Sequence, residues 1–379
     1  MVACLIVGAS IVSIWYCSKK RKSCYRYTYF GSFSRSVPTA ELTAMGFLPE
    51  KCAAQLPELF DSWNTLSEKL PFLNKTKRIV HAVKSMPQIP RVDEELSKLT
   101  VWQLRRAHVC LGQLAHSYLN SHMLEKSDQA IIRAWRSSDA THTFDEDQRL
   151  DSVQQIQRDE DSRPVLPSAL ARPLGFVCRQ LGVPPVLTAA ALDLWNWRLK
   201  DPTLPFELNN LDIISSITGT DTEKNFHLLP VRMHHAAASV LPGVLGYHIL
   251  VEAQRWTELQ HVIESLTSLL DKFVVLFEQV YSLVDIEVFY QVYRPYLSGW
   301  ESQGLWLEGV APHPPPSALV TAAPVSVGRE GRSFTNAKGP SAGQSAMFFL
   351  FDAMLGVRCS KRPSQANGFQ DEQIWYLTR

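Results

Sequence analysis

The longest unbroken helical pattern in the chain runs from Arg255 to Val284. Apolar residues recur there at the spacing of one helix face over about eight turns. They are Leu259, Val262, Ile263, Leu266, Leu270, Phe273, Phe277, Val280 and Val284. A stripe of this length predicts a long helix that packs against a core, and core packing is the first interpretation of the pattern, ahead of any functional role.

The same spacing recurs elsewhere in the chain. Apolar residues follow it between residues 42 and 73, and again from Val101 to Tyr118 after Thr100, a candidate N-cap. Val186–Leu199 is apolar almost all round, which predicts a buried helix. Because no stretch shows the two-residue alternation of a strand, the sequence predicts an all-α fold without strands.

Changes in composition divide the chain of 379 residues into an extension and two helical domains. Residues 1–41 form an apolar and then basic N-terminal extension. Residues 42–217 are expected to form a small helical domain, with an acidic loop at 137–162 that holds eight acidic and two basic residues. Residues 218–379 are expected to form a larger helical domain, interrupted by an inserted proline-rich loop at 310–340.

The N-terminal extension leaves two interpretations open. Val2–Cys17 is mostly apolar but shorter than the roughly 20 residues of a spanning helix, and its basic cluster follows it, unlike that of a cleaved signal. Residues 2–22 therefore act either as a marginal membrane anchor or as an extension without a structural role. Seven cysteines without a CxxC motif favour a reducing compartment. The expected location is the cytoplasm, with membrane anchoring as the alternative.

Several classes of function are disfavoured by composition and motifs. A formal net charge of +1 gives no general attraction to nucleic acid. The chain contains no GxGxxG, phosphate-binding lysine loop, GxSxG or HExxH motif and no internal repeat. Four histidines, at positions 227, 234, 235 and 248, lack the spacing of a helical metal-binding pair, so a metal site there is not expected.

The stretch FYQVYRPYLSGW at residues 289–300 carries a candidate binding residue. It surrounds one guanidinium, that of Arg294, with five aromatic residues: Phe289, Tyr290, Tyr293, Tyr296 and Trp300. A cation enclosed by aromatic side chains is costly unless it is paired, and the guanidinium fork fits a carboxylate in a bidentate manner. The pattern predicts either a pocket for a flat, apolar acid or a structural arginine bonded to backbone carbonyls.

A second candidate lies at the start of a helix after the proline-rich loop. The sequence Ser341-Ala-Gly-Gln-Ser-Ala combines small residues with serines. Backbone amides at such a helix start are free to donate to an anion, for example a carboxylate or a propionate.

These two stretches, with five others, resemble the indoleamine 2,3-dioxygenase family. FYQVYRPYLSGW (289–300) and GPSAGQSAMFFLFDAMLGV (339–357) are similar to the two strongest signatures of that family. Further similar stretches occur in the family's order: GFLP (46–49), LPELFDSWNTLSEKLP (56–71), LTVWQLRRAHVCLGQLAHSY (99–118), LPSALARP (166–173) and VPPVLTAAALDLWNWRLKDP (183–202). The resemblance covers about residues 43–370.

The resemblance implies a fold, a cofactor and a reaction. The fold is all-α, with haem b held between a small N-terminal and a larger C-terminal domain. The reaction is the O2-dependent cleavage of the indole ring of tryptophan to N-formylkynurenine, in the kynurenine pathway. The implied partners are tryptophan and O2, without nucleic acid, and the implied state is a monomer.

The resemblance also assigns roles to residues of this chain. Arg294 would bind the substrate carboxylate and Phe289 would pack on the indole. The remaining pocket positions are Leu297, Phe226, Ser341, Ala342, Ala189 and Leu192. Of these, Ser341 and Ala342 would contact a haem propionate or the ammonium side of the substrate.

The chain departs from the family pattern at several positions. Ala189 stands where a pocket tyrosine is usual, and Asp193 stands where the family has an apolar residue. Pro230 and Arg232 replace small or apolar residues. The proximal haem histidine of the family would lie beyond Arg379, so no metal ligand is expected within this chain. The alternative to an active dioxygenase is therefore a catalytically silent, truncated isoform.

Overall fold

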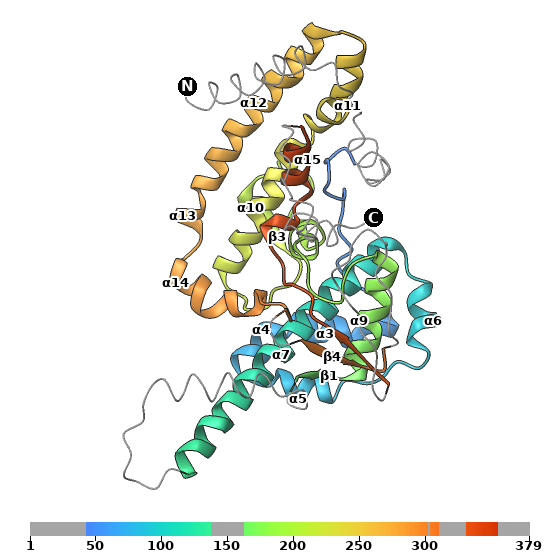
Figure 1. Ribbon diagram of the computed structural model, residues 1–379, viewed down its shortest axis with the longest axis vertical. Coiled ribbons are helices and arrows are strands. Elements are labelled where there is room, and N and C mark those ends of the chain that lie inside the picture. Colours follow the sequence, from blue (N-terminus) through green and yellow to red (C-terminus); the bar gives the residue numbers. More distant parts are fainter. Residues whose placement is uncertain (1–42, 138–162, 302–303, 311–330, 355–379) are drawn as a thin grey trace, which may run out of the picture.

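The computed structural model describes residues 43–137, 163–301, 304–310 and 331–354 (Figure 1). The N-terminal extension, the acidic stretch after Ser137, most of the proline-rich loop and the segment after Met354 lie outside the described residues. Most of what is described is helical, so the prediction of an all-α fold class is confirmed.

The first half of the described chain is a set of helices around one long helix. It contains η2 (Glu58–Phe60), α3 (Asp61–Glu68), α4 (Leu70–Lys75), α5 (Ile79–Lys84), α6 (Val92–Ser97), α7 (Val101–Ser137) and α9 (Ser168–Leu181). The long helix is α7, and it packs on α3, α4, α5 and α9. Its start agrees with the predicted cap, because the Gln103 N–H donates to Thr100 Oγ1 and the Thr100 N–H donates to Gln103 Oε1.

The second half begins with short elements and continues with longer helices. It contains η4 (Ala190–Leu194), η5 (Leu208–Asn210), α10 (Asp221–Ala237), α11 (Leu241–Glu252), α12 (Trp256–Glu278), α13 (Val280–Leu283), α14 (Ile286–Val288), η6 (Phe289–Tyr293), η7 (Arg294–Leu297), η8 (Ala342–Gln344) and α15 (Ala346–Met354). The predicted long helix is confirmed as α12 and α13, which run along one side of the molecule next to α11 (Figure 1). Within α12 the buried side chains are Leu269 and Phe273, while Phe277 of the predicted stripe is 45% exposed.

Two small sheets contradict the expectation that the chain has no strands. One has the order β1-β4-β5, in which β1 (Val165–Leu166) pairs parallel with β4 (Leu305–Glu308) and β4 pairs antiparallel with β5 (Arg332–Thr335). The other pairs β2 (Trp197–Leu199) with β3 (Leu211–Ile213). Strands of two to four residues are too short to show alternation in the sequence. Their pairing partners also come from distant parts of the chain, so no local pattern reveals them.

The segment Val186–Leu199 also differs from its predicted form. It is buried as expected, but instead of one helix it forms the π-helical turn η4 and then strand β2. Apolar composition indicates burial without distinguishing a helix from a strand, and here the pairing with β3 decides the outcome.

Apolar side chains form three buried clusters. The largest includes side chains from α3 to α9 and also Tyr293, Trp300 and Leu305 from the second half. A second cluster joins α10, α11, α12 and α15, and a third surrounds Trp197 and Leu211. The domain division after residue 217 stays a prediction. None of the described helices is both long and apolar enough to cross a membrane.

Two glycines allow a close backbone crossing between the regions of the two signature stretches. A Cβ atom at Gly299 would lie 2.2 Å from the backbone nitrogen of Gly339, and one at Gly339 would lie 2.1 Å from the carbonyl oxygen of Leu297. Next to this crossing the Trp300 N–H donates to the Ala337 carbonyl at 2.8 Å. The segment 297–300 therefore lies directly against the segment that leads into the Ser341 turn.

Replacing either crossing glycine by alanine should destabilise the fold. Because the neighbouring atoms are backbone and cannot rotate away, we expect Gly299→Ala and Gly339→Ala each to lower the free energy of unfolding by at least about 2 kcal/mol. The control is Gly246→Ala in α11, where an added Cβ meets nothing within 4 Å. This substitution should stabilise the helix by roughly 0.5–1 kcal/mol. Urea unfolding followed by circular dichroism measures all three. Equal stability of the crossing variants and the control would contradict the close approach.

Candidate functional site

The buried side chain of Gln344 connects the Ser341 turn to the segment before η4. Its Oε1 accepts a hydrogen bond from the Ala189 N–H at 2.9 Å, and its Nε2 donates to the Gly339 carbonyl at 2.9 Å. Three predicted pocket residues, Ser341, Ala342 and Ala189, are thereby brought into one region. The sequence analysis missed Gln344, because an amide in a polar turn gives no local sign of being buried.

A buried imidazole ties the same segment to η7. His116 Nδ1 donates to the Tyr296 carbonyl at 2.8 Å, while Nε2 accepts from the Leu187 N–H at 3.0 Å. The ring packs on Trp300 with 4.4 Å between centroids, and Trp300 Nε1 donates to the Pro185 carbonyl. Burial lowers the pKa of His116 to about 4, so the ring is neutral at pH 7. With both ring nitrogens bonded, His116 is a structural histidine of the core.

Two of the predicted pocket residues form an aromatic wall. The rings of Phe226, from α10, and Phe289, from η6, lie 4.7 Å apart between centroids at an interplanar angle of 43°. Tyr293 packs beside both, at 6.3 Å from Phe226 and 6.0 Å from Phe289. Phe226 and Phe289 are only partly buried, so the pair presents an aromatic surface at the edge of the largest cluster.

Arg294 does not lie where its aromatic neighbours in the sequence suggested. The residue is exposed, and its guanidinium carbon is 5.9 Å from the ring centroid of Tyr290, itself 58% exposed. Tyr293 and Trp300 point instead into the largest cluster. No ion pair or hydrogen bond to the Arg294 side chain occurs among the described residues. The expected enclosed guanidinium is therefore wrong, and so is the alternative of an arginine bonded to backbone carbonyls.

A buried polar chain lies behind the aromatic wall. Asp193 Oδ1 is 2.7 Å from His227 Nδ1, and His227 Nε2 is hydrogen-bonded to the Tyr293 hydroxyl. Burial raises the pKa of Asp193, while the hydrogen bond to His227 acts in the opposite direction. Burial, followed by the charges of Glu223 and Asp193, raises the pKa of Tyr293 well above its usual value. The sequence analysis noted Asp193 as unusual but did not connect it with His227.

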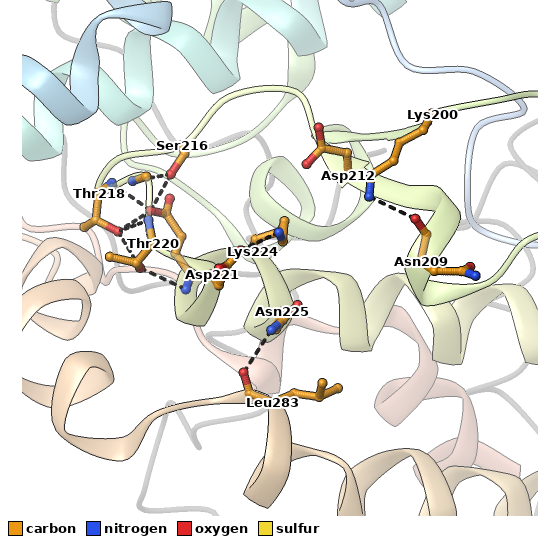
Figure 2. A network of polar contacts seen from close by, with 12 residues as sticks. Lys200, Asn209, Asp212, Ser216, Thr218, Thr220, Asp221, Lys224, Asn225 and Leu283 are labelled. Atoms are coloured by element: carbon orange, nitrogen blue, oxygen red, sulfur yellow. Dashed lines mark hydrogen bonds and ion pairs between the residues drawn. The ribbon is translucent and has the colours of Figure 1, made fainter.

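The start of α10, which positions Phe226 and His227, is held by a separate polar network (Figure 2). The buried carboxylate of Glu223 accepts hydrogen bonds from the Ser216 and Thr218 hydroxyls and from the amides of Ile217 and Thr218, at 2.6–2.7 Å. The Thr220 hydroxyl caps the helix by accepting from the Glu223 N–H. Farther along, Asn225 donates to the Leu283 carbonyl of α13. These contacts fix the helix that carries half of the aromatic wall.

The remaining predicted residues are less clearly placed for binding. Leu192 is buried in the largest cluster and Leu297 is packed against it. Ser341 Oγ accepts from the Gly343 N–H, and the amides of Gln344, Ser345 and Phe348 donate within the turn. Fewer free amides remain for an anion than the sequence suggested. Among the described residues, no hydrogen bond joins Ser341 or Ala342 to Arg294 or to the aromatic wall.

The two imidazoles that contact the candidate pocket segments on both sides have no unbonded ring nitrogen. His116 and His227 have both ring nitrogens in hydrogen bonds. Over the residues that the structure describes, no group of three or more His, Cys, Asp or Glu side chains is arranged to hold a metal ion. What the arrangement offers is an exposed cation, Arg294, over the Tyr290 ring, which in turn contacts Phe289 of the aromatic wall; a cation and aromatic rings together suit a ring-bearing carboxylic acid.

Comparisons with known proteins agree with the resemblance found in the sequence. The family profile described as "Indoleamine 2,3-dioxygenase" matches residues 41–379. Indoleamine 2,3-dioxygenase 1 of Rattus norvegicus is 27% identical over 338 residues, which are 88% of this chain and 69% of the rat protein. Indoleamine 2,3-dioxygenase of Saccharomyces cerevisiae is 25% identical over 322 residues, 83% of this chain and 59% of the yeast protein. The 6-hydroxytryptophan 2,3-dioxygenase of Fusarium equiseti is 24% identical over 335 residues, 88% of this chain and 68% of the fungal protein.

The buried histidines predict a loss of stability in mild acid. Burial lowers the pKa of His108, His116 and His234 to about 4, so between about pH 6.5 and 4 the unfolded chain binds protons that the folded chain does not. The free energy of unfolding should therefore fall as the pH falls, by about 1.4 kcal/mol per pH unit for each histidine in that window. Urea unfolding at a series of pH values measures this slope.

A pair of substitutions identifies the groups responsible for that slope. His234 has a buried Nδ1 with no hydrogen-bond partner among the described residues, so His234→Leu should reduce the slope by about a third. His81 is exposed on α5, and His81→Gln should leave the slope unchanged. A stability that does not vary between neutral and mildly acidic pH would contradict the assignment.

Proposed function

The chain belongs to the indoleamine 2,3-dioxygenase family, whose members are haem-dependent dioxygenases, and from this premise we propose that it cleaves the indole ring of tryptophan with O2 to give N-formylkynurenine. The product would enter the kynurenine pathway. The comparisons lend no support to the alternative of a catalytically silent isoform.

The observation that carries this proposal is the link from Arg294 to the Phe226–Phe289 wall through Tyr290, whose ring lies 5.9 Å from the guanidinium carbon of Arg294 and 5.5 Å from the ring of Phe289. Arg294 lies five positions after Phe289, where η6 passes into η7, and its guanidinium is available to a ligand. The two phenyl rings, 4.7 Å apart, offer the apolar surface that an indole requires. Tryptophan combines a flat aromatic ring with a carboxylate, and it matches both features.

Each residue then has a specific part in holding the substrate. Arg294 would pair with the carboxylate through two parallel N–H donors, and Phe289 and Phe226 would exclude water from the indole. Other pocket positions are proposed on the resemblance: Leu297, Ala189, Leu192, Ser341 and Ala342. Holding the ring and the carboxylate in fixed positions contributes to catalysis by reducing the entropy lost on the way to the transition state.

The described residues fit only part of a haem site. Haem b is the proposed cofactor, and it would supply the chemistry that activates O2. The small turn at Ser341 and Ala342 would lie beside a propionate. However, both ring nitrogens of His116 and of His227 are already hydrogen-bonded, so either histidine could act as an axial ligand only by giving up one of these bonds.

A second substrate class can be tested in the same assay. One relative is named for 6-hydroxytryptophan, so a ring-hydroxylated tryptophan is the alternative substrate. We further propose that the protein acts in the cytoplasm as a monomer, and anchoring through residues 2–22 remains the alternative. Cell fractionation and light scattering distinguish these states.

Purified protein supplied with hemin and a reductant such as ascorbate tests the proposed reaction directly. We expect a Soret absorption band and, with L-tryptophan under 18O2, N-formylkynurenine that carries both labelled atoms in the mass spectrum. A protein that shows the band but forms no product from tryptophan or 6-hydroxytryptophan would refute the proposed activity, while leaving the family assignment in place.

Arg294→Ala should weaken the handling of tryptophan. A lost charge-assisted hydrogen-bonding pair costs about 1.5–3 kcal/mol, which corresponds to a roughly 10- to 150-fold rise in KM. Because the guanidinium is exposed, its removal should leave the free energy of unfolding nearly unchanged. Tryptamine, which lacks the carboxylate, serves as the control substrate and should be handled alike by both proteins. An equal rise in KM for tryptophan and tryptamine would show that Arg294 does not pair with the substrate carboxylate.

A further inference from the structure

Three polar residues behind the aromatic wall form one connected chain. Asp193 lies in η4, His227 in α10 and Tyr293 at the end of η6. His227 and Tyr293 are almost completely buried, and the Asp193 side chain is 20% exposed. We propose that these residues form a hydrogen-bonded relay that positions the substrate-binding residues beside them. The inference rests on the proposed function for the identity of the substrate.

Each member of the relay is the chain neighbour of a proposed pocket residue. Asp193 follows Leu192, His227 follows Phe226, and Tyr293 precedes Arg294. Successive side chains on a helix point about 100° apart, so one residue of each pair can join the relay while its neighbour lies elsewhere. The last pair shows this plainly, because Tyr293 is buried and Arg294 is exposed. A bond between relay members therefore fixes the backbone that carries a pocket residue.

Ring contacts link the relay to the aromatic wall as well. Tyr293 stands edge-on to His227, with 5.4 Å between centroids and an angle of 87°. The same Tyr293 ring contacts Phe226 and Phe289, and Phe226 contacts His227 at 5.3 Å. A shift of the Tyr293 ring would thus move both rings of the aromatic wall, Phe226 and Phe289, and the backbone of Arg294.

The chemistry of the three groups allows every buried atom of the relay to be bonded. With Asp193 ionised, the His227 Nδ1–H donates to the carboxylate and Nε2 accepts from the Tyr293 hydroxyl. This arrangement accounts for both contacts that the structure shows.

A chain of this kind specifies position more than it adds stability. Polar groups placed among apolar side chains are costly unless all are bonded, so a network of them tolerates few alternative arrangements. The relay therefore acts through Arg294, Phe226 and Phe289, and its members are positioning residues rather than catalytic ones. Asp193 is the position at which this chain carries a charge where the family resemblance predicts an apolar side chain.

Tyr293→Phe tests the relay by removing a single oxygen atom. Calorimetry on the full chain supplied with hemin should show the Kd of tryptophan rising roughly tenfold, as expected for one lost hydrogen bond to a buried partner. The Kd of tryptamine should rise less, so that the ratio of the two increases about fivefold. Tyr281→Phe is the matched control, since Tyr281 is 91% exposed and should leave both ligands unaffected. An unchanged ratio would overturn the proposal.

Double substitution tests whether the relay acts as a unit. His227→Phe keeps a planar ring but cannot bond to Tyr293, so His227→Phe combined with Tyr293→Phe should bind tryptophan no more weakly than the weaker single variant. Asp193→Asn keeps an acceptor oxygen and should restore most of the affinity that Asp193→Leu removes. Losses of affinity that multiply in the double variant would count against a relay. So would an Asp193→Asn variant that binds tryptophan as weakly as Asp193→Leu.

A spectroscopic measurement decides the question without any substrate. The bond between Asp193 and His227 should give a downfield imidazole N–H proton resonance that is absent in Asp193→Leu and shifted in Tyr293→Phe. If the wild-type chain binds no tryptophan, the proposed function fails while this resonance still supports the relay. A wild-type spectrum without the resonance would overturn the relay itself.

Discussion

The candidate site depends on one close backbone crossing. Residues 297–300 and 337–339 approach so tightly that only glycine fits at positions 299 and 339. This crossing determines where η7 ends and where the Ser341 turn begins. The pocket positions on both sides are consequently placed by contact between two backbones. Backbone contact of this kind is insensitive to side-chain rotation, and it gives the site a rigid base.

Buried polar groups extend this arrangement into the rest of the fold. Gln344 bonds to Ala189, and His116 joins Leu187 to Tyr296. Apolar burial provides most of the stability of such a protein, but it permits many alignments of similar surfaces. A neutral imidazole or amide that must satisfy two partners at once permits far fewer. The polar cross-links therefore select the alignment in which the pocket stretches meet.

The exposure of Arg294 changes the physical basis of the proposed carboxylate binding. An enclosed guanidinium would carry a desolvation cost in the free protein, whereas an exposed one stays hydrated until a carboxylate replaces the water. The enclosed position was predicted from the aromatic residues next to Arg294 in the sequence. Helical geometry turns those neighbours in different directions, so Tyr293 enters the core while Arg294 faces solvent.

The sequence by itself determined the helical class, the start of α7 at its Thr100 cap, the long helix α12 and the family resemblance, because helix periodicity and capping act between residues a few positions apart. It also indicated which segments are buried. Only the tertiary structure decided the short strands, the π-helical turn at η4, the outward position of Arg294 and the relay from Asp193 to Tyr293. The relay bonds join residues 34 and 66 positions apart. Whether two such side chains meet depends on how the intervening helices pack, which no local pattern encodes.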